Sequence, residues 1–210
     1  HGGSFVARES SIATYLSSPG FCRNSRSSEV HILHDVPLTF TYTRFAFAHF
    51  FLVQSNGNIT SNEFRFVLFR NHLTKFVSQS STHEHIYLTD LSDVTVLMQP
   101  PAHSELVVAS DAQGARRWLR SKGQLMGYPN EDAYMQSLGN GTVFVYNCGI
   151  LGGPSTMLRT FLEALVTRLV WFWSDRPVQN TCYGADMFFV NRSIIKFLTD
   201  FGPLLVFFII

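Results

Sequence analysis

Short apolar runs alternate along this chain with segments whose apolar residues recur at helical spacing. The runs predict strands over residues 29–34, 45–53, 86–89, 105–109 and from 142 to about 147. The helical spacing predicts helices over residues 10–16, 61–76 and 155–170, a basic helical turn over 116–122, and a helix opening near residue 186. An order in which strands and helices alternate is typical of an α/β sandwich with a mostly parallel sheet.

Two carboxylates follow the third apolar run, at the point where the run breaks. Residues 86–97 read IYLTDLSDVTVL, so Asp90 and Asp93 stand three apart at the end of a buried strand. A close carboxylate pair there favours Mg²⁺ or Mn²⁺, which prefer oxygen ligands and often share them with a substrate phosphate. The alternative is a solvated turn that caps the strand. For both side chains to converge, the chain must turn between them, because residues three apart on a strand face opposite sides.

A glycine-rich segment connects the next strand to a helix. Residues 143–154 read VFVYNCGILGGP, which places Asn147, Gly149, Gly152 and Gly153 just before a helix-patterned run. Glycines allow a ligand to approach the backbone, and the N-terminus of the helix offers N–H groups to an anion. The segment is therefore a candidate ligand-binding loop, with an ordinary β-turn-α connection as the alternative.

Two further charged residues are candidates for chemistry. Asp186 opens an apolar helical run in the segment YGADMFFVN, residues 183–191. At an exposed helix N-terminus its carboxylate stays ionised and is able to accept a hydroxyl proton or oppose a positive sugar carbon, the alternative being a helix cap. Arg65 lies on the helix before the acidic strand, where it is a candidate for binding phosphate or a solvated or core-rim charge.

Taken in this order, the three segments resemble the GT-A type of nucleotide-sugar glycosyltransferase. The resemblance runs from about residue 30 to about residue 198 and is most specific over 90–100 and 146–153. It implies a three-layer α/β/α GT-A fold and a Mn²⁺ or Mg²⁺ ion held by Asp90 and Asp93 on the donor diphosphate. It also implies that Asn147 and Gly149 line the donor-sugar pocket, with Asp186 beside the reacting carbon as in glycogenin-like relatives. The three-residue spacing departs from the usual Asp-x-Asp, and the Gly-x-His segment that supplies a third ligand in that group has no counterpart.

Three functions are compatible with these segments. The leading hypothesis is a metal-dependent glycosyltransferase that moves a sugar from a nucleotide-sugar donor to a glycan or protein hydroxyl. A metal-dependent phosphohydrolase is a second enzyme class, although the chain has no basic phosphate clamp. A catalytically inactive sugar- or nucleotide-binding domain is the third.

Composition sets the broad limits. The 210 residues, 46% hydrophobic and 15% charged, predict one well-buried domain over residues 1–210. With 16 basic and 15 acidic residues, the net charge of +1 gives no reason to expect nucleic-acid binding. The first strand-like run comes only near Val30, which predicts a fragment that lacks the opening GT-A strand.

Location is predicted from glycosylation triplets. Asn58-Ile-Thr60 and Asn140-Gly-Thr142 lie in predicted loops and favour the lumen of the secretory pathway, Golgi or endoplasmic reticulum. The apolar residues 204–210 are too few to span a bilayer, so a membrane is expected only through a missing anchor.

The sequence does not predict a metal-binding role for the histidines. His31 and His34 lie on one predicted strand, and His83 and His85 lie just before the acidic strand. Strand alternation places His85, five residues before Asp90, on the opposite face.

Overall fold

A computed structural model describes most of the predicted elements. The described residues are 9–23, 29–35, 38, 45–54, 61–76, 85–91, 94–98, 102, 104–111, 145–175, 189–191, 193–194 and 205–208. The chain divides into two compact units, one formed by His1–Gly57 with Thr89–Ala102 and the other by Asn58–Leu88 with His103–Ile210. Each unit is described by itself.

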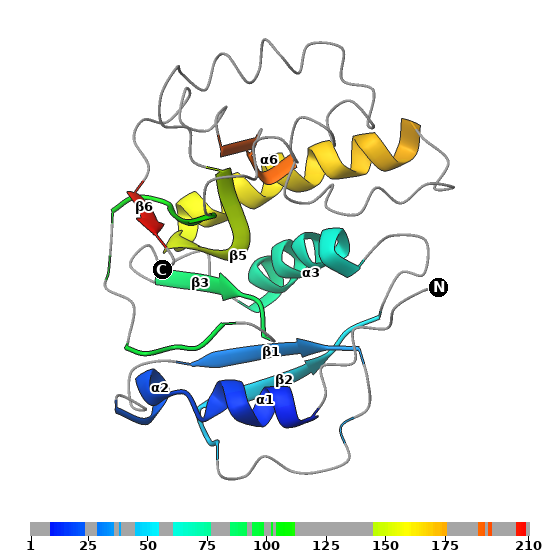
Figure 1. The fold of residues 1–210 in the computed structure, drawn as a ribbon. Coiled ribbons are helices and arrows are strands. Elements are labelled where there is room, and N and C mark those ends of the chain that lie inside the picture. Colours follow the sequence, from blue (N-terminus) through cyan, green and yellow to red (C-terminus); the bar gives the residue numbers. More distant parts are fainter. Residues whose placement is uncertain are drawn as a thin grey trace. The chain divides into compact units, whose positions relative to one another are not determined.

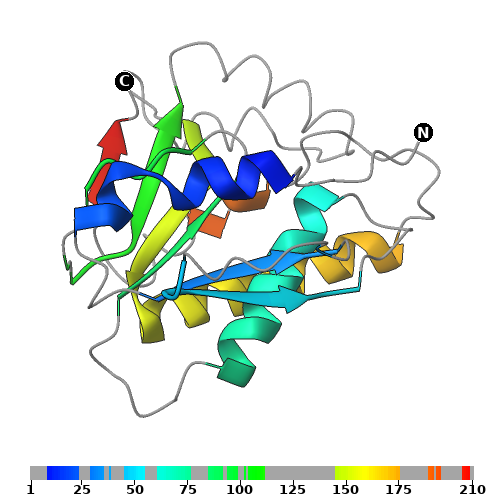
Figure 2. The same ribbon diagram turned by 90° about the horizontal axis from the view of Figure 1, so that it is seen from below.

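The described residues of the first unit form two parallel strands and two short helices. Strands β1 (Val30–His34) and β2 (Ala48–Leu52) pair in parallel, from Val30 opposite Ala48 to His34 opposite Leu52. Figures 1 and 2 both show these strands side by side. The helices are α1 (Glu9–Leu16) and α2 (Pro19–Arg23).

Helical and strand periodicity together build the core of the first unit. On α1, Ile12, Tyr15 and Leu16 are buried at the three- and four-residue spacing of one helix face. On β1, burial alternates along the strand, so Val30 and Ile32 enter the same core. The positions between them, His31 and Leu33, are only half-buried and face the other side of the strand pair.

The second unit contains a four-stranded sheet. Its strands are β3 (His85–Thr89, of which Thr89 belongs to the first unit), β4 (Val107–Asp111), β5 (Val145–Pro154) and β6 (Leu205–Phe208), in the order β3-β5-β4-β6. Strand β4 pairs antiparallel with β5 and parallel with β6.

Two long helices are described in the second unit (Figure 1). These are α3 (Ser61–Phe76) and α6 (Ser155–Asp175), which contact each other. One face of α6 is fully buried, at the spacing i, i+3, i+4, i+7, i+8 and i+11, through Leu158, Phe161, Leu162, Leu165, Val166 and Leu169. These side chains pack with Phe66 of α3 and with Leu88, Val108 and Leu151 of the sheet.

The predicted elements that fall on described residues are confirmed, with small shifts of their ends. The expected helices over 10–16 and 61–76 are α1 and α3, and the helix expected over 155–170 continues to Asp175 as α6. The strands expected over 29–34, 45–53, 86–89 and 105–109 are β1 to β4. The basic turn over 116–122 lies outside the described residues.

The GT-A sandwich itself stays a prediction. The described strand pairs include two parallel ones, β1–β2 and β4–β6, and the antiparallel pair β4–β5. Among the described helices, none is both long enough and apolar enough to cross a membrane.

Candidate functional site

The end of β3 places the first carboxylate of the acidic pair. Strand β3 ends at Thr89, and Asp90 follows at once as a half-buried residue. The hydroxyl groups of Tyr15 and Thr89, two residues of the first unit, form a hydrogen bond of 2.7 Å. In the described sheet, however, β3 is the first strand of the order, and Leu88 is its one buried residue, whereas the apolar run predicts a buried strand. Asp93 lies outside the described residues, so convergence of the two carboxylates stays a prediction.

The glycine-rich segment is a strand, and its prediction as a loop is wrong. Strand β5 runs through Asn147 and Gly149 to Pro154, and α6 begins at the next residue. Along β4, Val108 pairs with Leu151 but Ala109 pairs with Asn147, so residues 148–150 form a bulge. Figure 1 shows the sharp bend of β5. The Asn-x-Gly sequence thus forms the bulge, and the strand continues beyond it.

Close packing explains the two consecutive glycines of β5. A Cβ atom at Gly152 would overlap the ring of Tyr87 on the neighbouring strand β3. Gly153 has a φ of 139°, which L side chains rarely adopt, and its Cβ would lie 2.7 Å from the carbonyl oxygen of Glu105. Both positions therefore require glycine for structural reasons, and their role in donor binding stays a prediction.

The remaining predicted site residues are Gly149, Arg65 and Asp186. Gly149 is buried within β5. Arg65 is half-buried on α3, with its guanidinium carbon 5.0 Å from the ring centroid of Phe66. That contact is typical of an arginine packed at the rim of a core. Asp186 lies outside the described residues.

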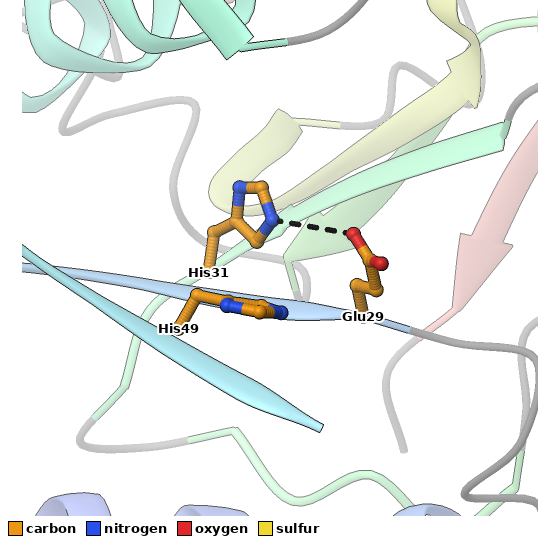
Figure 3. Close-up of side chains that lie close together, drawn as sticks. All are labelled: Glu29, His31 and His49. Atoms are coloured by element: carbon orange, nitrogen blue, oxygen red, sulfur yellow. Dashed lines mark ion pairs between the residues drawn. The ribbon is translucent and has the colours of Figure 1, made fainter. Parts of the chain in front are cut away.

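A cluster of possible metal ligands lies on the strand pair of the first unit. Its members are Glu29, His31 and His49 (Figure 3), whose nearest ligand atoms all lie within 4.8 Å of one another. His31 and His49 are directly paired between β1 and β2, and Glu29 precedes His31 by two residues. Paired residues and residues two apart share one face of a sheet, which is why the three side chains meet.

The cluster combines one anchored side chain with two exposed ones. Glu29 and His49 are exposed, whereas the ring of His31 is half-buried and lies 5.1 Å from the ring of Phe51. Nε2 of His31 lies 3.7 Å from a carboxylate oxygen of Glu29, and the two histidine rings are 5.4 Å apart at 78°. Burial lowers the pKa of His31, and His49 lowers it further against the opposing effect of Glu29. These influences favour the neutral imidazole, the form that ligates a metal.

The sequence analysis missed this cluster because its members are far apart along the chain. His31 and His49 are brought together by the parallel register of β1 and β2, which no local pattern reports. The available signal was the alternation Glu29-x-His31 on a predicted strand, with a second histidine inside the next predicted strand.

The first unit also has an open depression beside α1. It is lined by small and polar residues, which are Ala13, Thr14, Ser17, Ser18, Pro19 and Thr95. The lining offers no charged side chain to a diphosphate and no aromatic ring to a sugar, so it is a weaker candidate than the histidine cluster.

Neither protein-family models nor curated protein sequences give a match to this chain. The GT-A resemblance consequently rests on the three sequence segments themselves, which are the acidic segment, the glycine-rich segment and the segment that contains Asp186.

Proposed function

We propose that this chain is a metal-dependent glycosyltransferase that moves a sugar from a nucleotide-sugar donor to a hydroxyl group of a glycan or protein acceptor. The observation that carries the proposal is the end of β3. A half-buried carboxylate, Asp90, stands directly after the strand, and a second, Asp93, follows three residues later in the sequence. Ligand groups in α/β sheets collect outside the carboxyl ends of strands.

Asp90 and Asp93 would hold Mn²⁺ or Mg²⁺, since carboxylate oxygens are the ligands that both ions prefer. When bound, the ion supplies positive charge for the departing nucleoside diphosphate. Asp186 would accept the acceptor's proton or oppose positive charge on the sugar carbon. Asn147 and Gly149, with Gly152, Gly153 and Arg65, are the proposed donor contacts.

The hydrogen bond between Tyr15 and Thr89 supports this assignment of roles. Charged ligands bind a metal well only when the backbone that carries them is held in place. The bond fixes the last residue of β3, one position before Asp90. A lumenal location, Golgi or endoplasmic reticulum, is proposed on the triplets at Asn58 and Asn140.

The decisive experiment measures Mn²⁺-dependent release of nucleoside diphosphate from a panel of nucleotide sugars. We expect turnover in the unchanged chain and its loss in Asp90→Asn and in Asp93→Ala. Asp35→Asn is the matched control, because Asp35 also follows directly on a strand, β1. Turnover that needs no metal, or that survives in Asp93→Ala, would contradict the proposal.

Two further assays separate the alternatives. Hydrolysis of a generic phosphate ester without sugar transfer would indicate a phosphohydrolase, and nucleotide binding without turnover would indicate an inactive binding domain. Asp186→Asn should abolish transfer with nearly unchanged affinity for nucleotide and metal. Near-normal turnover in that variant would reassign Asp186 as a helix cap.

A further inference from the structure

We propose that Glu29, His31 and His49 form a binding site for a divalent transition metal, Zn²⁺ or a similar ion, on the β1–β2 strand pair. This site is separate in its residues and its chemistry from the carboxylate pair at the end of β3. Its proposed ligands are two imidazole nitrogens and one carboxylate oxygen (Figure 3).

The donor set selects the class of metal. Imidazole suits Zn²⁺, Cu²⁺ and Ni²⁺, whereas Mg²⁺ and Ca²⁺ prefer oxygen ligands alone. Two histidines and one acid are also the set found in zinc sites that keep a fourth position open for water or a substrate. The cluster is therefore matched to an ion other than the one proposed for Asp90 and Asp93.

The backbone fixes the relative positions of the ligands. The parallel ladder places His31 opposite His49, between the pairs Val30–Ala48 and Ile32–Phe50. The buried partners of the ladder, Val30 and Ile32, lock this register, since a slip of one residue would turn them out of the core. The histidine pair is thus as well defined as the strand pairing itself.

The distances leave only a small adjustment for metal binding. Ligand atoms of a tetrahedral zinc site lie about 3.3 Å apart, given bonds of about 2.0 Å. The pair His31–Glu29 is already at 3.7 Å, and all three ligand atoms lie within 4.8 Å. His31 is held by its neighbour Phe51, whereas the exposed side chains of Glu29 and His49 are free of core packing and need only rotate toward it.

Stability alone gives a poor account of the cluster. Glu29 is 76% exposed in its pair with His31, and an exposed ion pair at this distance contributes little. That ion pair also leaves the second imidazole unexplained, because the ring of His49 lies beside the ring of His31, 5.4 Å from centroid to centroid. A shared cation satisfies all three groups at once.

The test is calorimetric titration of the chain with Zn²⁺, together with visible absorption spectra after Co²⁺ substitution. We expect one Zn²⁺ per chain and a Co²⁺ spectrum of four-coordinate type. Glu29→Gln and His49→Ala should each weaken Zn²⁺ binding at least about tenfold and abolish that spectrum. Both changes are at exposed positions, and circular dichroism verifies that the variants remain folded.

Two controls make the result specific. His85→Ala removes an exposed histidine on another strand, β3, and should leave Zn²⁺ affinity unchanged. Asp90→Asn should also leave it unchanged, which separates this site from the glycosyltransferase proposal. Binding lost in either control but kept in His49→Ala would overturn the inference, as would the absence of Zn²⁺ binding to the unchanged chain.

Discussion

The glycine segment of β5 and the histidine pair of β1 and β2 contrast in what explains their residues. Gly152 and Gly153 form part of a motif that the sequence marks as a ligand loop, yet contacts with Tyr87 and Glu105 already account for them. His31 and His49 are unremarkable in the sequence, yet the strand register gathers them with Glu29. Packing is thus sufficient to explain the glycine motif. It does not explain why two histidines and a glutamate gather on a half-exposed face of a strand pair, because no core needs those residues there.

The largest loss of stability is expected on substitution of Gly153. Replacement by Ala adds a side chain at a φ of 139° and places it 2.7 Å from the carbonyl oxygen of Glu105. Backbone strain and overpacking should together lower the free energy of unfolding by about 3 kcal/mol. Urea unfolding measures the change. A variant as stable as the unchanged chain would show that packing does not require this glycine and would strengthen the proposal that Gly153 contacts a donor.

Gly152→Ala should lower the free energy of unfolding by less, about 2 kcal/mol, because the added Cβ would meet one side chain instead of backbone. The matched test is the double variant with Tyr87→Ala, which removes the ring that the new methyl group would overlap. In a double-mutant cycle the two losses should be less than additive. Fully additive losses would mean that Tyr87 is not what constrains Gly152.

The same contrast explains what the sequence was able to predict. The stripe of Leu158, Leu165 and Leu169 identified α6, and the apolar runs identified β1 to β4, because these signals are local. The bulge in β5 and the pairing of His31 with His49 depend on which strand lies beside which. Register between strands distant in the chain arises from the core as a whole, so no local pattern reports it.

A smaller effect is expected at the hydrogen bond between Tyr15 and Thr89. Tyr15→Phe keeps the buried ring and removes only the hydroxyl group, which lies 2.7 Å from that of Thr89. The free energy of unfolding should fall by about 1 kcal/mol. Val30→Ala is the packing control, because it shortens an apolar side chain in the same core. An unchanged stability would show that this bond does not hold the end of β3.

The stability of Tyr15→Phe should also depend differently on pH in alkaline solution. Burial raises the pKa of Tyr15 above its ordinary value of 10.0, against the lowering effect of Thr89. A group whose pKa is raised on folding contributes stability that is present below its unfolded pKa and is lost as the pH rises. Above pH 10 the unchanged chain should therefore lose stability more steeply than Tyr15→Phe. Parallel losses in the two proteins would contradict this assignment.

The smallest effect is expected at His49, which completes the comparison with the glycines. In a metal chelator, His49→Ala should change the free energy of unfolding by no more than about 0.5 kcal/mol, because the side chain is exposed and enters no core. Ile32→Ala, on the adjoining strand but buried, should instead cost about 2–5 kcal/mol. Thermal and urea unfolding of the pair measure both. If His49→Ala proved as costly as Ile32→Ala without metal, the histidine would have a packing role like that of Gly152, and its position beside His31 would no longer call for a ligand.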